Sequence, residues 1–214
     1  MTTVVFDLNG TLTDTAALAA PWRGAAPARF GPEVLDEAIA MSMVDTLTGQ
    51  FRRFPDLLRG ALVRRATLAG LPLGPVDEAL EAAASLPARP DAAAALDHLR
   101  EHDHAIAVLT NSAAVAGRHT LDAAGLLVRV DRIDGADAVR AYKPDPRVYA
   151  LTVAPEEAWF VAAHWWDVTG AARAGFRTAW ISVDDAVLPE TAAAPEITAP
   201  DLLTAVQEIT TPAA

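Results

Sequence analysis

The sequence predicts an α/β protein: a doubly wound parallel sheet with a helical cap subdomain inserted after its first strand. Three observations support this class. A short buried strand is expected at residues 3–6, residues 15–90 contain only helical patterns, and strands alternate with helices from residue 91 onward. Such alternation is typical of a parallel sheet covered by helices. We therefore assign residues 1–14 and 91–214 to the core and residues 15–90 to the cap.

The individual elements follow from apolar periodicity and from chain breaks. After an opening segment interrupted by Pro and Gly, the cap helices are expected at about 33–50, 55–69 and 76–85, before a linker at 86–90. The core helices are expected at about 91–101, 113–124, 144–151, 168–174 and 201–209. The later strands are expected at 104–109, 127–130, 158–162 and 177–181. Asp91 is expected to cap the first core helix.

Composition narrows the class of protein. The chain has 214 residues, of which 52% are hydrophobic, and this is ample for a core. It has no cysteine, which excludes disulfides, thiolate metal sites and cysteine nucleophiles. We find no apolar run long enough to span a membrane and no secretory signal, so we expect a cytoplasmic protein without a membrane partner.

The net charge of −11 is unevenly distributed. Residues 15–90 carry eight Arg and eight Asp or Glu, so the rest of the chain holds the whole excess of negative charge. A nucleic-acid partner would require clustered positive charge, and none is present. A small anionic substrate is compatible with this balance only if a few cations are placed locally.

Chemically useful side chains follow several of the predicted strands. Asp7 ends the first strand, Thr110 and Asn111 follow the second, and the strand at 158–162 leads through His164 to Asp167. The carboxyl ends of parallel strands share one edge of the sheet, which is where such folds bind ligands.

A single lysine adds to this group. Lys143 is the only Lys among 17 basic residues, and it precedes the helix expected at 144–151. A compact ammonium differs chemically from a guanidinium, so we regard Lys143 as a functional candidate. Each of these side chains also has a structural interpretation: Asp7 can cap a turn, and Thr110, Asn111 and Asp167 can cap helices. Their coincidence at one edge favours an active site.

Four segments, in order, resemble the motifs of the haloacid dehalogenase superfamily. They are FDLNGTLTD at residues 6–14, VLTNS at 108–112, YKPDPRVY at 142–149 and FVAAHWWDVTGAARAGFRTAW at 160–180. The resemblance covers most of the chain and implies a haloacid dehalogenase-like, Rossmann-type core with a helical cap. It also implies that Asp7 is a nucleophile.

Two departures from the common pattern of this superfamily indicate a branch. Most members are magnesium-dependent phosphatases with a second Asp two residues after the nucleophile, where this chain has Asn9. An Asp four residues before the position of Asp167 is also usual, and here it is Ala163. The chain therefore loses both a general acid and a metal ligand. The same departures are expected of the 2-haloacid dehalogenases, which need no metal or other cofactor, because a halide leaves without a proton.

The resemblance to that branch implies a role for each site residue. Asp7 would attack the halogen-bearing carbon, expel halide and form an ester that water hydrolyses. Lys143 would hold Asp7 ionised, and Asp167 would orient Lys143 and the water. Thr11 would hydrogen-bond the Asp7 carboxylate or the substrate carboxylate.

The substrate itself would contact a second set of residues. Thr110 has the same expected partners as Thr11, and Asn111 would cradle the halide. The other residues expected to contact substrate are Leu8, Asn9, Phe54, Tyr149, Trp166 and Arg23.

The chain also departs from the dehalogenases themselves. Their halide-binding arginine would fall near Leu35, and Arg23 and Arg29 are the nearest candidates. His164 stands where well-studied members have Asn, and it either assists the water as a base or bonds to backbone. Asn9 replaces an aromatic residue, so the substrate can differ from a simple haloacetate.

Three functional hypotheses follow. The first is metal-independent dehalogenation of a short 2-haloacid, the second is a catalytically lapsed binding or regulatory protein on the same fold, and the third is a phosphatase. The resemblance also suggests a homodimer.

Overall fold

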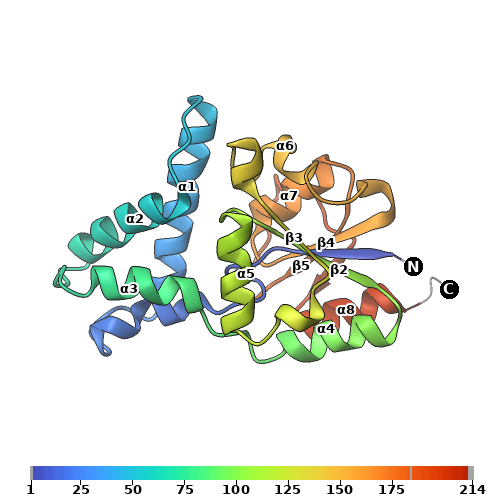
Figure 1. Cartoon of the computed structure of the whole chain (residues 1–214), viewed down its shortest axis with the longest axis horizontal. Helices are drawn as coiled ribbons and strands as arrows, with labels where there is room; N and C mark the ends of the chain where they lie inside the picture. Colours follow the sequence, from blue (N-terminus) through green and yellow to red (C-terminus); the bar gives the residue numbers. More distant parts are fainter. Residues whose placement is uncertain (1, 184, 212–214) are drawn as a thin grey trace.

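The structure is a computed structural model that describes residues 2–183 and 185–211. Its centre is a parallel sheet with the strand order β3-β2-β1-β4-β5-β6 (Figure 1). The strands are β1 (Thr3–Phe6), β2 (Ala105–Thr110), β3 (Arg132–Gly135), β4 (Ala158–Ala162), β5 (Arg177–Ile181) and β6 (Ile197–Ala199). The order reverses at β1, which pairs with β2 on one side and β4 on the other. In sheets of this topology, ligands bind beyond the carboxyl ends of the strands at such a reversal.

Alternate residues of β1 face two different apolar layers. Val4 and Phe6 pack with buried residues of α4 and α8, whereas Val5 packs with those of α6 and α7. The core helices are α4 (Ala92–Glu101), α5 (Ala114–Ala123), α6 (Pro146–Tyr149), α7 (Trp165–Arg173) and α8 (Leu202–Thr210). Because side chains alternate along a strand, Asp7 continues the row of Val5.

Residues 15–90, which we call the cap segment, lie at one end of the core (Figure 1). They form the elements η1 (Thr15–Trp22), α1 (Phe30–Leu47), α2 (Phe54–Leu68), α3 (Val76–Ala82) and η2 (Ala83–Ser85). The two connections to the core run side by side: the Asp14 N–H donates to the Pro87 carbonyl, and the Arg89 N–H to the Leu12 carbonyl, both at 2.9 Å. The division into core and cap at these residues stays a prediction.

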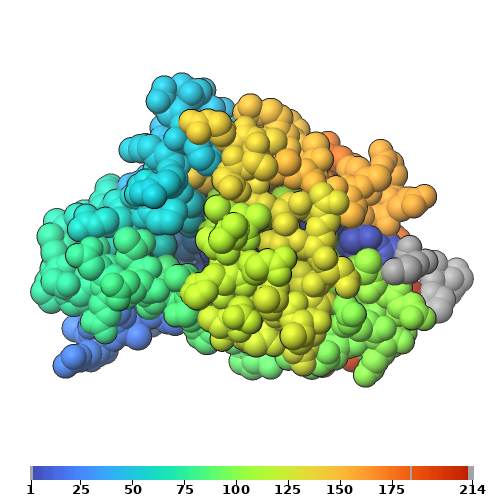
Figure 2. All heavy atoms as spheres, viewed as in Figure 1, coloured from blue at the N-terminus to red at the C-terminus, as the bar shows by residue number. Residues whose placement is uncertain are grey.

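The cap segment and the core are in contact along their shared side. Buried residues of α1 and α2 belong to the same apolar cluster as Val5 and Phe160 of the sheet. Figure 2 shows the two parts meeting, with a recess between the cap segment and the yellow-green region of α5. No helix in the described ranges is both long enough and apolar enough to span a bilayer.

Several expectations about single elements were wrong. Residues 127–130 do not form a strand: Leu127–Arg129 is a 3-10 turn, and β3 begins at Arg132. The 3-10 turn follows Gly125, at which the chain leaves the end of α5. Asp131 then accepts a hydrogen bond from the Ile106 N–H (2.8 Å), just before β3 pairs with β2. The strand β6 and the 3-10 helix η1 were not expected, because both lie in segments with Pro and little periodicity.

Two side chains at helix starts are placed differently from expected. Asp91 makes no capping bond to α4, and its carboxylate accepts from the Leu203 N–H at the start of α8 (3.2 Å). Helix α7 begins at Trp165, three residues earlier than expected, so Asp167 lies inside its first turn. Asp167 is therefore part of the helix and does not precede it.

Candidate active site

The Asp7 side chain is fixed by the turn that follows β1. The Asp7 N–H donates to the Val161 carbonyl (3.1 Å), which extends the pairing of β1 with β4 by one residue. The Thr11 hydroxyl then donates to Asp7 Oδ2 (2.8 Å) and accepts from the Ala163 N–H (3.0 Å). Because the Thr11 oxygen accepts from a backbone amide, its hydrogen is directed to the carboxylate.

Lys143 joins the two carboxylates of the site. Its Nζ lies 2.8 Å from Asp7 Oδ1, 2.6 Å from Asp167 Oδ2 and 3.0 Å from the Leu109 carbonyl. These three acceptors use all three ammonium hydrogens, and the Lys143 side chain is fully buried. The other Asp167 oxygen accepts from the Tyr149 hydroxyl at 2.6 Å.

Burial and neighbouring charges set the ionisation of this cluster. Burial raises the pKa of Asp7, but the charge of Lys143 and the His164 ring outweigh it and hold that pKa well below its usual range. Burial lowers the pKa of Lys143, yet Asp167 and Asp7 raise it above its ordinary value. Burial raises the pKa of Asp167 and the Asp7 charge adds to this, against the opposing effect of Lys143. Asp7 is therefore an ionised carboxylate beside a permanent cation.

His164 lies on the open side of Asp7. Its Nδ1 is 3.5 Å from Asp7 Oδ2 and has no hydrogen-bond partner among the described residues. Its ring stacks on Trp166 at a centroid distance of 5.3 Å. Burial lowers the pKa of His164, but Asp7, then Asp167 and Asp36, raise it above its ordinary value.

The loop after β2 supplies an amide and a hydroxyl. Asn111 Oδ1 accepts from the Lys143 N–H (2.8 Å), while its Nδ2 is buried without a hydrogen-bond partner among the described residues. A buried amide donor without a partner is costly unless a ligand satisfies it. The Thr110 hydroxyl accepts from the Ser112 N–H (3.1 Å), so it holds the turn and does not bond Asp7.

A cavity of about 10 Å³ lies against Asp7. From the core it is lined by Asp7, Asn9, Thr110, Asn111, His164 and Trp166, and from the cap segment by Leu35, Ile39 and Phe54. The cap segment therefore contributes only apolar side chains to the lining among the residues that the structure describes.

Most residues predicted for the site come together here, but three expected substrate contacts do not. Leu8 is fully buried in the apolar cluster on the α4 and α8 side of the sheet, because its side chain points to the opposite face from Asp7. Tyr149 is fully buried behind Asp167 and bonds that carboxylate. Arg23 is exposed at the end of η1, where its left-handed backbone (φ 51°) turns the chain, and it does not line this cavity.

The position where the halide-binding arginine of the dehalogenases was expected holds Leu35. Leu35 itself lines the cavity, and Arg29, the other arginine candidate, is exposed at the start of α1 and not part of the lining. His98 and His102 lie on α4 and at its end, and neither lines the cavity. Within the described ranges, no group of three or more His, Asp or Glu side chains is placed to hold a metal ion.

One residue that braces the site was not predicted. The Arg89 guanidinium donates to the Gly10 carbonyl from Nε (3.0 Å) and Nη2 (2.7 Å), which braces the turn after Asp7. Its position in the linker at 86–90, between two prolines, gave no sign of this contact. The sequence indicated only that this linker leads from the cap segment back to the core, where the end of β1 lies.

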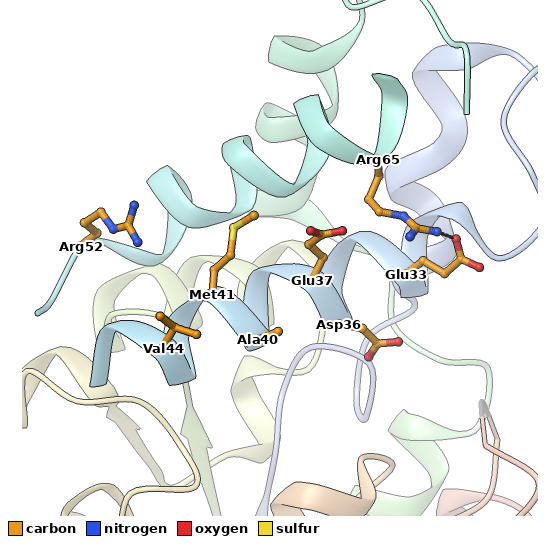
Figure 3. A pocket seen from close by; sticks show the side chains of 8 residues that line it. All are labelled: Glu33, Asp36, Glu37, Ala40, Met41, Val44, Arg52 and Arg65. Atoms are coloured by element: carbon orange, nitrogen blue, oxygen red, sulfur yellow. Dashed lines mark hydrogen bonds and ion pairs between the residues drawn. The ribbon is translucent and has the colours of Figure 1, made fainter. Parts of the chain in front are cut away.

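A larger hollow of about 630 Å³ lies on the outer side of the cap segment between α1 and α2 (Figure 3). Its lining includes acidic residues of α1 and the ion pair of Glu33 with Arg65. It shares no lining residue with the cavity at Asp7, so its size does not make it the reaction site.

Comparisons with known proteins agree with this geometry. A family model described as haloacid dehalogenase-like hydrolase matches residues 1–175. The (S)-2-haloacid dehalogenase 4A of Burkholderia cepacia is 33% identical over 190 residues, covering 83% of this chain and 81% of the relative. The L-2-haloacid dehalogenase of Xanthobacter autotrophicus has a similar structure, with a TM-score of 0.86, 26% identity and 100% coverage of both chains.

A further solved structure of the Xanthobacter autotrophicus enzyme, with chloropropionic acid covalently bound, has a TM-score of 0.85 and 27% identity, again with 100% coverage of both chains. The family match spans the Asp7, Lys143 and Asp167 segments that the structure brings together. The chain belongs to the haloacid dehalogenase-like hydrolases, in the branch of the 2-haloacid dehalogenases.

Proposed function

We propose that this protein hydrolyses the carbon–halogen bond of a 2-haloalkanoic acid through an ester at Asp7, without a metal ion. One observation carries the proposal: an ionised Asp7, held by Lys143 and Thr11, lines a cavity together with Asn111, whose buried amide has no hydrogen-bond partner among the described residues. The names of the relatives, and the covalently bound chloropropionic acid in one of them, support the same reaction.

In the first step, an Asp7 carboxylate oxygen attacks the carbon that bears the halogen. The new C–O bond forms as the carbon–halogen bond breaks, and the halide leaves with the bonding electrons. Asn111 Nδ2 is a free donor in the cavity and is placed to receive the halide. No proton is needed, which agrees with Asn9 at the position of a general acid.

In the second step, water attacks the carbonyl carbon of the Asp7 ester. His164 accepts a proton from that water, the acyl C–O bond breaks, and the 2-hydroxy acid leaves after taking up a proton. The position of His164 Nδ1, 3.5 Å from Asp7 Oδ2 and without another partner, supports this role. Asp167 is fully buried and does not line the cavity, so we assign it to positioning Lys143 and not to orienting the water.

The side chains that could act as metal ligands support a reaction without a metal ion. Asp7 and Asp167 share the Lys143 ammonium, so a divalent cation would compete with a cation that the fold already supplies. Ala163 offers no side-chain oxygen, and its backbone groups bond Thr11 and Trp180. Mg²⁺ requires several oxygen ligands, so the same residues weigh against a phosphatase.

A catalytically lapsed binding protein is the second candidate. It is favoured by the purely apolar lining that the cap segment contributes, with no arginine beside Asp7 among the described residues. Halide release decides between the two candidates, because a lapsed protein would bind a haloacid without turning it over.

The experiment is halide release from chloro-, bromo- and fluoro-acids with and without EDTA. We expect release that EDTA does not reduce, and a transient Asp7 ester detectable by mass spectrometry. Asp7→Asn should remove both, with an activity loss of about 10⁴-fold or more, while the fold persists. Loss of turnover in EDTA, or faster turnover of a phosphate ester, would contradict the proposal.

Two further expectations, a cytoplasmic location and a homodimer, remain predictions. The hydrodynamic size of the purified protein tests the dimer.

A further inference from the structure

A second cavity, of about 250 Å³, lies directly beyond the one at Asp7. The two share Asn9, Leu35 and Phe54 in their linings. The larger cavity runs between the cap segment and α5, and we call it the apolar cleft. Its other lining residues are Thr15, Leu18, Pro55, Leu58, Leu80, Ala83, Ala84, Leu86, Ser112, Ala116 and Thr120.

The apolar cleft has a buried wall and an exposed rim. None of its lining residues carries a charge, and Leu18, Leu58 and Leu86 in its wall are buried. Ala84 and Ala116, which also line it, are exposed and mark the side open to solvent. The polar side chains of its lining, Asn9, Thr15, Ser112 and Thr120, are all neutral. A carboxylate in this cleft would therefore lose its hydration without gaining a cationic partner, whereas an alkyl chain would gain by leaving water.

The space at Asp7 is too small for a long substrate. A cavity of about 10 Å³ corresponds to roughly one water molecule. Asn111 and His164, the groups assigned to the halide and the water, line this cavity and do not line the apolar cleft. Any longer substituent on the reacting carbon must therefore extend past Asn9 into the apolar cleft.

We propose that the apolar cleft binds the alkyl chain of the substrate, so that this enzyme prefers 2-haloalkanoic acids with chains of several carbons over haloacetate. The inference rests on the proposed function and names the substrate class for the same site. The cleft, at about 250 Å³, has about 25 times the volume of the cavity at Asp7, which leaves space for such a chain. The open rim at Ala84 and Ala116 allows longer chains to end in solvent.

The test compares 2-bromopropanoate, 2-bromohexanoate and 2-bromooctanoate as single enantiomers. We expect kcat/KM to rise with chain length, by at most about fourfold for each methylene that is fully buried, and to level off once the chain reaches the rim. Ala116→Phe narrows the cleft from an exposed helix position. It should lower the ratio of kcat/KM for the hexanoate over the propanoate about tenfold. Val115→Phe is the matched control, because Val115 is 82% exposed and does not line the cleft.

The outcomes of this test distinguish a failure of the chain-length inference from a failure of the proposed function. If kcat/KM does not rise with chain length, or if Ala116→Phe leaves the ratio at the wild-type value, the cleft does not bind the alkyl chain. An equal loss for short and long substrates in Ala116→Phe would identify the cleft as a passage to the site and also overturn the inference. In each case halide release from 2-bromopropanoate by the wild-type enzyme still supports the proposed function. No release from any haloacid would instead contradict the function itself.

Discussion

At the scale of single residues, one ammonium is shared by two buried carboxylates. Asp7, Lys143 and Asp167 are each at least 94% buried, and together they carry one net negative charge. Removing a partner from a buried ionic cluster leaves an uncompensated charge in a poorly solvated site. Lys143 is consequently a structural requirement as well as a participant in the chemistry.

We expect Lys143→Met to lower the free energy of unfolding by about 3–5 kcal/mol, since two carboxylates then remain buried without a cation. It should also abolish halide release, because Asp7 loses the charge that keeps it ionised. Urea unfolding and halide release measure the two effects. Arg147→Met, which breaks an exposed ion pair with Asp145 in the same segment, should change neither. Wild-type stability in the Lys143 variant would show that the carboxylates are not charged.

The pKa of His164 leads to a prediction about pH. Asp7 and Asp167 raise this pKa above its ordinary value against the effect of burial. When Asp7 becomes an ester, its charge is lost, so the pKa of His164 falls and the ring is released to act as a base. Ester hydrolysis should therefore slow only as the pH falls below that lowered pKa.

Rapid-quench mass spectrometry between about pH 5 and 8 follows the ester directly. His164→Ala should accumulate the Asp7 ester at every pH, with one equivalent of halide released per enzyme, and should lose the acidic limb. Normal turnover in this variant would assign His164 to packing against Trp166 and not to catalysis.

At the scale of single elements, the turn after β1 depends on Gly10. Gly10 has a φ of 90°, which side chains rarely adopt, and a Cβ there would lie 2.7 Å from His164 Cε1. Its carbonyl is held by the Arg89 guanidinium. The turn thus combines a conformation that requires glycine with close contact to a proposed base.

Gly10→Ala should be destabilising and should also reduce activity, because the added methyl displaces His164. Gly24→Ala is the matched control: its φ is 86°, but a Cβ there would meet no atom within 4 Å. In the control, backbone strain alone should lower the free energy of unfolding, by about 1–2 kcal/mol, and the activity should be unchanged. Denaturant unfolding and halide release compare the two. Equal activities in both variants would contradict the proposed importance of the His164 position.

At the scale of the whole molecule, the excess of negative charge opposes an anionic substrate. The net charge is −11, and the balanced charge of residues 15–90 leaves all of it on the remainder of the chain. Exposed charges act over about 30 Å at 0.01 M ionic strength and about 10 Å at 0.1 M. A haloacid must therefore approach Asp7 against a repulsive long-range field.

Raising ionic strength from about 0.01 to 0.2 M should increase kcat/KM for a haloacid about twofold, because salt screens that repulsion. The sign follows from like charges on protein and substrate, and kcat should change little. Sulfate is the appropriate salt, since chloride is a reaction product. A fall in kcat/KM with salt would instead indicate that attraction by local cations dominates.

The sequence by itself determined the fold class, the alternation of strands and helices and the placement of Asp7, Lys143 and Asp167. These depend on local patterns, namely buried runs, chain breaks and the rule that parallel strands end at one edge. The strand expected at 127–130 failed for the same reason, because local apolar content does not fix which residues pair with β2.

Only the tertiary structure decided where several of these side chains lie relative to Asp7 and which groups they contact. Tyr149 stands behind Asp167, Arg23 faces solvent, and Arg89 reaches Gly10 across 79 residues of sequence. Distances between side chains on different elements depend on packing, which periodicity does not encode. The apolar cleft has the same origin, since its walls come from the cap segment and α5, which meet only in the folded chain.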